Sequence, residues 1–320
     1  MGSICTSYTC SSLSLLLLCW GASASTFTFV NKCDFTVWPG ILANAGSPVL
    51  ETTGFELPRG TQRSFQAPTG WSGRFWGRTG CNFAGSGSGS GRCDTGDCGT
   101  GQVTCDSNGA ATPVTLAEIT LGSGGQDFYD VSLVDGFNLP VIMEATGGTG
   151  GVCASTGCVA DLNGQCPAEL KVGDAVGCKS ACVAFETPEY CCSGDFGSPA
   201  TCKPSAYSNM FKLACPTSYT YAYDDATSTF TCIGADYTVT FCPSTPSQKS
   251  SMTTTPNPGF SGEGESRMGS GSSSEVTTDE SWLAGLAMGG STMTDPSTLL
   301  RSVSTMLISV MNKVVKGLAR

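Results

Sequence analysis

Histidine is absent from all 320 residues of the chain. This absence excludes catalytic triads, imidazole general bases and metal sites that depend on histidine. Charged residues are also scarce, at 13% of the chain, and no basic cluster offers a surface for nucleic acid. Any chemistry must therefore come from carboxylates, hydroxyl groups, arginine or the shape of the surface.

The N-terminal apolar run is far shorter than the roughly 20 residues needed to span a bilayer. It extends from Leu13 to Trp20 and is followed by Ala22-Ser23-Ala24, a small-residue cleavage pattern. A basic residue, which usually precedes such a run, is missing here. We interpret residues 1–24 as a secretory signal peptide and expect the mature chain to start near Ser25.

Cysteine, by contrast, is abundant, and sixteen of the nineteen cysteines lie between Cys33 and Cys242. An even number at this density behind a secretory leader predicts a disulfide framework formed in an oxidising compartment. A zinc or iron–sulfur cluster is the alternative, but the spacings are scattered rather than paired as C-x-x-C. Spacing alone leaves the pairing open, because sixteen cysteines allow about two million combinations.

The negative charge is confined to the cysteine-rich body. Residues 25–243 contain 20 acidic and 10 basic side chains, whereas residues 244–320 contain 6 of each. Such a body should repel nucleic acid and anionic lipid and tolerate neutral sugars or cations. Residues 244–281 are dominated by Ser, Thr, Gly and Pro, which predicts a disordered, O-glycosylated stalk. No Asn-x-Ser/Thr sequence occurs, so N-glycosylation is not expected.

Short runs of β-forming residues separated by Gly, Ser and Pro predict an all-β sandwich or barrel. Thr26–Val30 and Phe35–Trp38, which ends at Pro39-Gly40, look like an opening hairpin. Further strands are expected at 74–78, 114–121, 128–133 and 237–241. Strand signals fade between Cys153 and Cys215, where cysteines are dense and only residues 175–186 have weak helical periodicity. This segment is expected to form a stapled lobe of loops and one helix.

One cysteine-containing segment carries a specific pattern. Residues 89–101 read GSGRCDTGDCGTG and are followed by Cys105. Other segments match in order: WGRTGC at 76–81, TLAE at 115–118, DGFNLP at 135–140, EYCC at 189–192 and DDATSTFTC at 224–232. Together they resemble the thaumatin-like proteins, the plant pathogenesis-related family five, over residues 25–243. The resemblance does not extend to the tail.

The resemblance implies an antiparallel β-sandwich with a disulfide-rich loop and helix lobe at about 153–215, held by eight disulfides. The implied pairs are Cys33–Cys242, Cys81–Cys93, Cys98–Cys105, Cys153–Cys232, Cys158–Cys215, Cys166–Cys178, Cys182–Cys191 and Cys192–Cys202. The first of these ties together the two terminal strands. A loop of that length restricts the unfolded chain most, so resistance to heat and proteases is expected.

The family also implies an acidic cleft between the sandwich and the lobe. Carried over residue by residue, its members are Arg74, Glu118, Asp130, Asp135 and Asp224, with Arg78 as the alternative arginine. Crowded carboxylates raise one another's pKa, so that one stays protonated while another is ionised, as glycoside hydrolysis requires. In that reaction we expect Glu118 to be the acid and Asp135 the base or nucleophile, with Arg74 orienting the cluster.

A structural role is the competing interpretation for each acidic residue, because strand carboxylates are more often solvated or cap turns. Asp225 is expected to cap the turn that follows it, and Asp94 and Asp97 to organise tight turns in the signature loop. In a cleft that binds sugar without cleaving it, Tyr129 and Tyr223 would supply stacking faces.

The expected function is that of a secreted defence protein that binds β-1,3-glucan of fungal walls in the acidic cleft. At most it would be a weak endo-β-1,3-glucanase. Alternatives are a protein that permeabilises fungal membranes and a developmental wall protein without activity. The protein is expected in the apoplast or cell wall, as a monomer, with neither a cofactor nor a metal.

The C-terminal segment has a helical pattern of its own. Asp295-Pro296 offers an N-cap with proline at the first helical position, and apolar residues then recur three and four residues apart. We expect residues 295–320 to form an amphipathic helix that lies on a membrane surface, is removed as a sorting propeptide, or stays disordered until it is bound. A glycolipid-anchor signal is the rival, but Arg301, Lys313 and Lys316 interrupt the apolar tail it requires.

Overall fold

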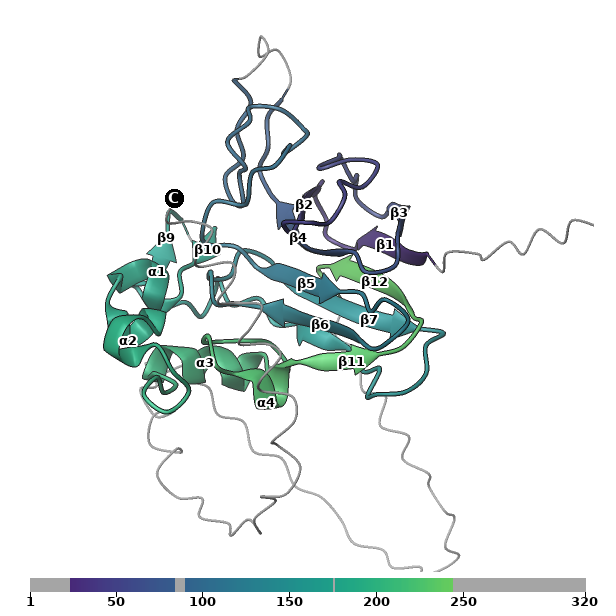
Figure 1. Cartoon of the computed structure of the whole chain (residues 1–320). Coiled ribbons are helices and arrows are strands. Elements are labelled where there is room, and N and C mark those ends of the chain that lie inside the picture. Colours follow the sequence, from purple (N-terminus) through teal and green to yellow (C-terminus); the bar gives the residue numbers. More distant parts are fainter. Residues whose placement is uncertain (1–23, 84–89, 175, 244–320) are drawn as a thin grey trace, which may run out of the picture. The chain divides into compact units, whose positions relative to one another are not determined.

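The computed structural model describes residues 24–83, 90–174 and 176–243 (Figure 1). The expected signal peptide up to residue 23, the stalk at 244–281 and the C-terminal helix at 295–320 lie outside the described residues. Across the described ranges, every helix is too short or too polar to cross a membrane.

Two five-stranded sheets make up the described sandwich, as the sequence predicts. The first has the order β3 (Gln62–Ala67), β1 (Ser25–Asn31), β12 (Asp236–Phe241), β7 (Val141–Thr146) and β8 (Thr156–Cys158). The second has the order β11 (Phe230–Cys232), β6 (Asp127–Ser132), β5 (Leu116–Thr120), β4 (Ser72–Arg78) and β2 (Trp38–Ala43). The strand pairs of both described sheets are antiparallel, apart from β1 with β12.

Aromatic side chains from both sheets fill the space between them. Phe27 and Phe29, two residues apart on β1, are fully buried because alternate residues of a strand point to the same face. Both rings contact Phe75 of β4 edge to face, with centroid distances of 4.9 and 5.1 Å. Trp71 stacks on Phe75 at 5.4 Å. Each such ring contributes about 1.5–3 kcal/mol by leaving water, so this cluster is a main source of stability.

The expected opening hairpin is wrong. β1 pairs with β12 and β3 in the first sheet, whereas β2 pairs with β4 in the second. The chain therefore crosses between the sheets after Cys33. β2 also runs through Pro39 and Gly40, where the sequence predicted a stop. Proline is tolerated there because β2 is an edge strand of its sheet.

The lobe contains more helix than the sequence predicts. Beside the two-stranded ladder of β9 (Lys171–Val172) and β10 (Gly177–Cys178) are α1 (Ala181–Phe185), α2 (Pro188–Cys191), a 3-10 turn at Gly194–Phe196 and α3 (Ala206–Ala214). A last helix, α4 (Asp225–Ser228), precedes β11.

The longest of these helices, α3, has signals that the sequence analysis missed. The hydroxyl of Ser205 caps it by accepting a hydrogen bond from the backbone N–H of Ser208 at 3.1 Å. Phe211 then buries its ring in the small core of the lobe, together with Leu133, Phe137 and Leu170.

The sixteen cysteines of the described body form eight disulfides, with the pairs that the family resemblance implies. They are Cys33–Cys242, Cys81–Cys93, Cys98–Cys105, Cys153–Cys232, Cys158–Cys215, Cys166–Cys178, Cys182–Cys191 and Cys192–Cys202. Cys158, Cys166, Cys178 and Cys215 belong to the lobe core itself. Disulfides therefore support the lobe where its apolar core is small.

Disulfides that close loops of different length should stabilise the protein to different extents. Cys33 and Cys242 are 209 residues apart, whereas Cys182 and Cys191 are 9 apart. In the loop-entropy model their removal costs about 5 and about 3 kcal/mol. We expect Cys33→Ala/Cys242→Ala to lower the free energy of unfolding more than Cys182→Ala/Cys191→Ala, as measured by guanidinium unfolding. Equal losses would contradict this ranking.

Candidate functional site

Three charged residues lie side by side across neighbouring strands of the second sheet. The register aligns Arg74 of β4 with Glu118 of β5, and Glu118 with Asp130 of β6. Their chain neighbours Phe75, Ala117 and Val131 are fully buried in the sandwich core. Because side chains alternate along a strand, the three charged groups project from the opposite face. Cross-strand partners stand roughly 5 Å apart at Cβ, so their functional groups are within reach of one another.

The contacts within this row leave polar atoms unsatisfied. Arg74 Nε lies 3.6 Å from Glu118 Oε1, and the two side chains are 38% and 33% exposed. Arg74 Nε and Asp130 Oδ2 are buried atoms without a hydrogen-bond partner among the described residues. Buried polar atoms are nearly always paired in folded proteins. The row is therefore held by the charge of Arg74 opposite Glu118 more than by close hydrogen bonds.

Asp135 joins the row from the turn that follows β6. Its backbone carbonyl accepts a hydrogen bond from Val114 N at 3.1 Å, and Gly136 N donates to Leu133 O at 3.0 Å. These bonds fix the turn. The carboxylate of Asp135 interacts electrostatically with both Arg74 and Glu118. We call Arg74, Glu118, Asp130 and Asp135 the acidic cluster.

The pKa values of all three carboxyl groups in the acidic cluster are raised. Burial is the largest cause for each, because it disfavours the charged form. For Glu118, the Arg74 charge opposes the rise in pKa and the Asp135 charge adds to it. The pKa of Asp130 is raised well above its ordinary value, since burial is joined by repulsion from Glu118 and Asp225. The three carboxyl groups therefore hold their protons to higher pH than free carboxyl groups do, and their different neighbours shift them to different extents.

The alternative arginine has a structural role. Arg78 is fully buried, and its guanidinium donates hydrogen bonds to the backbone carbonyls of Trp38, Gln102 and Val103. Burial lowers its pKa to about 10, against the opposing charge of Asp97. Arg78 thus ties β2 to the signature loop, and Arg74 is the arginine beside the carboxylates.

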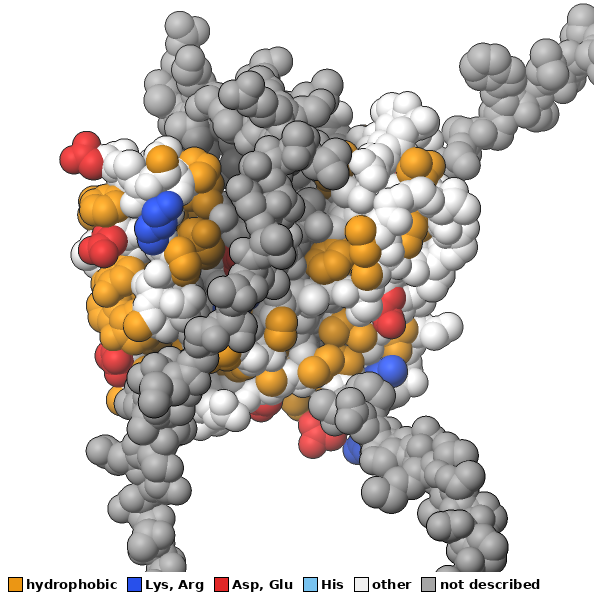
Figure 2. Space-filling view, turned by 90° about the horizontal axis from the view of Figure 1, so that it is seen from below, with side chains coloured by type: hydrophobic (Ala, Val, Ile, Leu, Met, Phe, Trp, Pro, Cys, Tyr) orange, Lys and Arg blue, Asp and Glu red, His pale blue; other side chains and the backbone are white. Residues whose placement is uncertain are grey.

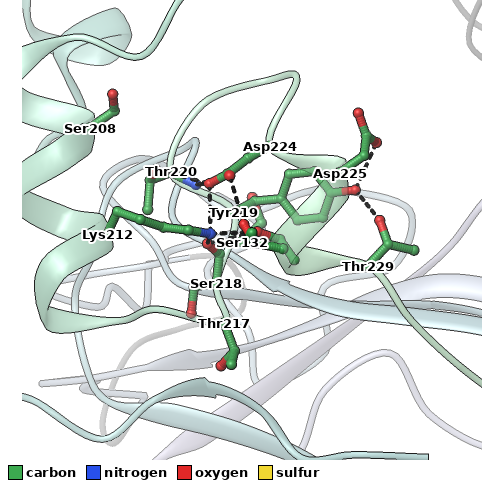
Figure 3. A network of polar contacts seen from close by, with 12 residues as sticks. Ser132, Ser208, Lys212, Thr217, Ser218, Tyr219, Thr220, Asp224, Asp225 and Thr229 are labelled. Carbon is green, nitrogen blue, oxygen red and sulfur yellow. Dashed lines mark hydrogen bonds and ion pairs between the residues drawn. The ribbon is translucent and has the colours of Figure 1, made fainter. Parts of the chain in front are cut away.

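Asp224 is engaged in a separate network with Lys212 of α3 (Figure 3). Lys212 Nζ lies 3.0 Å from Asp224 Oδ2 and also donates to Ser228 Oγ and Ser218 O at 2.8 and 2.9 Å. The same Oδ2 accepts from the N–H and the hydroxyl of Thr220, at 3.1 and 3.0 Å. These three donors use the hydrogen-bond acceptor capacity of Asp224 Oδ2. The structure gives Asp224 the task of holding the segment 217–228 against α3.

The neighbour Asp225, expected as a turn cap, contacts Tyr219 instead. The Tyr219 hydroxyl donates to Asp225 Oδ1 at 2.9 Å and also contacts the Thr229 hydroxyl, as the dashed lines of Figure 3 show. Tyr219 is fixed to β6, since its N–H donates to Val131 O and its carbonyl accepts from Leu133 N. Sequence reasoning missed Tyr219 because no local pattern indicates that residue 219 pairs with residues near 132.

Two other expectations concerned residues around the site. Tyr129 is 1% exposed and its hydroxyl donates to Ala154 O, so it cannot offer a stacking face to a sugar. Asp97 does organise a tight turn, because its carboxylate accepts from the N–H groups of Cys93 and Gly99, both at 2.6 Å.

Across the described ranges, no group of acidic or cysteine side chains is arranged to hold a metal ion.

The sequence model of the thaumatin family matches residues 31–243 of this chain. The chain therefore belongs to the thaumatin family. Among its relatives, Thaumatin-like protein 1 of Arabidopsis thaliana is 63% identical over 232 residues, which cover 71% of this chain and 89% of the relative. Pathogenesis-related thaumatin-like protein 3.5 of Cryptomeria japonica is 60% identical over 226 residues, which cover 70% and 92%.

A third relative carries the name of an enzyme. The protein named glucan endo-1,3-beta-glucosidase of Prunus avium is 52% identical over 241 residues, which cover 72% of this chain and 96% of that protein.

The raised pKa of Asp130 predicts an effect on stability. A native state with a raised carboxyl pKa keeps its proton longer than the unfolded chain, whose pKa is near 4, so stability is lost as pH rises above that value. We expect Asp130→Asn to remove this loss. Its advantage over the wild type should grow from pH 4 toward neutrality, by at most about 1.4 kcal/mol per pH unit for one proton.

Urea unfolding at several pH values measures this difference, and Asp34→Asn, at an exposed site, is the control. A variant advantage that stayed constant between pH 4 and pH 7 would contradict a raised pKa for Asp130.

Proposed function

We propose that this protein is a secreted plant defence protein that binds β-1,3-glucan of fungal cell walls at the acidic cluster. The observation that carries the proposal is the row of Arg74, Glu118 and Asp130 across three strands, in which the Arg74 and Glu118 side chains are partly exposed. A glucan presents hydroxyl groups that both donate and accept hydrogen bonds. Carboxylates accept from such hydroxyls, and a guanidinium donates to them.

Charge and family both support a neutral sugar as the ligand. Carboxyl groups outnumber the single arginine in the cluster, so an anionic ligand would be repelled. The Prunus avium relative is named a glucan endo-1,3-beta-glucosidase, and other relatives are named pathogenesis-related proteins. Eight disulfides are typical of a protein that folds and works outside the cytosol.

The proposal includes a second step, weak hydrolysis of the bound glucan. It requires a protonated acid and an ionised base or nucleophile on opposite sides of the scissile bond. Glu118 would be the acid and Asp135 the base or nucleophile, with Arg74 stabilising the ionised partner. The raised pKa of Glu118 agrees with an acid that keeps its proton.

Contact with fungal membranes is the second candidate function, because apolar side chains are exposed on the lobe. Phe185, Val176 and Leu213 are 36%, 39% and 66% exposed. Such side chains can enter the interfacial region of a bilayer. The acidic charge of the body disfavours anionic lipid, so this contact would depend on the apolar groups alone.

Retention on insoluble curdlan tests glucan binding. We expect the wild type to be retained and Glu118→Ala to elute in the void, a loss of about tenfold in affinity, because the hydrogen bonds that the Glu118 carboxyl group makes to the glucan are removed. Glu144→Ala is the matched control, since Glu144 is also a half-buried strand carboxylate but belongs to β7 of the other sheet. Equal retention of wild type and Glu118→Ala would contradict the proposal.

Release of reducing ends from soluble laminarin tests turnover. We expect slow release by the wild type and a drop of about a hundredfold or more in Glu118→Gln, since general acid catalysis contributes about 10²–10⁴. Glu144→Gln should match the wild type. If wild type and Glu118→Gln both bind laminarin but release nothing, the enzymatic part fails and binding stands alone.

A further inference from the structure

A shallow hollow of the lobe lies next to the acidic cluster and is lined by tyrosines. Tyr190 comes from α2, Tyr207 from α3 and Tyr221 from the segment that leads to α4. Ser180 and Thr220 contribute hydroxyl groups to the same lining. We call this feature the lobe hollow. None of its residues has a role in the function proposed above.

The aromatic rings at the hollow are held in place by their neighbours. Tyr190 and Tyr207 pack edge to face with a centroid distance of 6.1 Å, and Phe185 contacts them at 5.5 and 5.4 Å. The Tyr207 hydroxyl donates to Glu169 Oε1 at 2.8 Å. All three tyrosine side chains remain partly exposed. Rings fixed in advance lose little conformational freedom when a ligand covers them.

Disulfides make the walls of the hollow rigid. Cys182–Cys191 joins α1 to α2, and Cys192–Cys202 joins α2 to the segment before α3. Cys182 and Cys202 themselves belong to the lining. The hollow is therefore a fixed feature of the lobe, unlike a gap that closes when side chains move.

One wall of the hollow adjoins the acidic cluster along the chain. Val134 lines the hollow, and the next residue, Asp135, belongs to the acidic cluster. Thr220 also lines the hollow and follows Tyr219, whose N–H donates to Val131 O beside Asp130. A chain-like ligand centred on the acidic cluster would reach the hollow with its following units.

The charges around the hollow disfavour an anionic ligand. Glu169 and Glu189 stand at its rim, while Lys203 Nζ donates to Pro199 O at 3.2 Å. Figure 2 shows hydrophobic side chains gathered at the left of the body, the side of the lobe helices in Figure 1, with single acidic and basic groups among them. Aromatic faces beside hydroxyl groups suit a ring that is apolar on its faces and polar at its edge.

We propose that the lobe hollow is a second sugar subsite, in which Tyr190 and Tyr207 receive a pyranose ring of a glucan bound at the acidic cluster. The proposal rests on the proposed function, because the same glucan chain occupies both places. It assigns the selection for longer oligosaccharides to the lobe, and contact with the shortest ones to the acidic cluster.

Affinity as a function of oligosaccharide length tests the subsite. Laminaribiose and laminarihexaose are titrated calorimetrically into the wild type, Tyr190→Leu, Tyr207→Leu and Tyr190→Phe. We expect the wild type to bind the hexaose more tightly than the biose. Each leucine variant should weaken hexaose binding about three- to tenfold, the value of one aromatic contact, and leave the biose unchanged. Tyr190→Phe keeps the ring and should retain at least half of the wild-type affinity.

Asn209→Ala is the control, because Asn209 lies on the same helix as Tyr207 and is exposed outside the lining. Thermal midpoints within a degree of the wild type establish that each variant is folded. A leucine variant that misses this criterion is replaced by Lys203→Trp, which places a large ring over the hollow from an exposed position of its lining and should weaken hexaose binding alone.

Four results would overturn the proposal. Unchanged hexaose affinity in the leucine variants would remove the subsite and leave the acidic cluster as the binding site. A parallel loss for biose and hexaose would mean that the tyrosines act on the acidic cluster itself. Wild type that binds neither sugar would remove the proposed function and the subsite together. Unchanged sugar affinity with reduced dye release from phosphatidylcholine vesicles would make the lobe a membrane-contacting surface.

Discussion

The parallel pairing of β1 with β12 is the constraint on which the rest of the sandwich depends. It places the first and last strands of the body side by side in the middle of one sheet, and Cys33–Cys242 fixes them there. β3 and β7 then extend this sheet on either side. Because Phe27 and Phe29 of β1 supply the centre of the aromatic core, the second sheet packs onto a surface formed only when the chain ends meet.

The candidate site follows from the register of that second sheet. β4, β5 and β6 each turn one face to the core, and their other face carries Arg74, Glu118 and Asp130 in line. A shift of one residue in any strand would move its charged group into the apolar core. The hydrophobic pattern that holds the sandwich together therefore also sets the separation of the charged groups. Burial at this face raises the pKa values of Glu118 and Asp130, so keeping these carboxyl groups there costs stability above the pKa of the unfolded chain.

The lobe is stabilised by other interactions than the sandwich, and it is attached to the second sheet at one place. Its apolar core is small, and disulfides replace much of the stability that packing would supply. It joins the sandwich where Tyr219 pairs with β6, next to Asp130. Lys212 and Asp224 then hold that segment against α3. A short strand pairing and a partly buried ion pair thus help to fix the position of the lobe relative to the acidic cluster.

Local patterns in the sequence were sufficient to predict the β class, the strands around Arg74, Glu118 and Asp130, and the disulfide-stapled lobe. Alternating side chains and Gly or Pro turns act over a few residues, so they can be read without knowing the fold. The family motifs added the pairing of the sixteen cysteines. The error at the opening hairpin has the same origin, because adjacency in sequence favoured a partner for β1 that lies in the other sheet.

Tertiary structure alone decided which charged groups meet. Arg74 and Arg78 are four residues apart on one strand, yet Arg78 is enclosed by backbone carbonyls of distant segments and Arg74 faces the carboxylates. Asp224 and Asp225 are adjacent, yet Lys212 of α3 takes the first and Tyr219 takes the second. These choices depend on contacts between segments many residues apart. The sequence therefore determined which functional groups are present, whereas the packing of sheet and lobe determined which of them form the site.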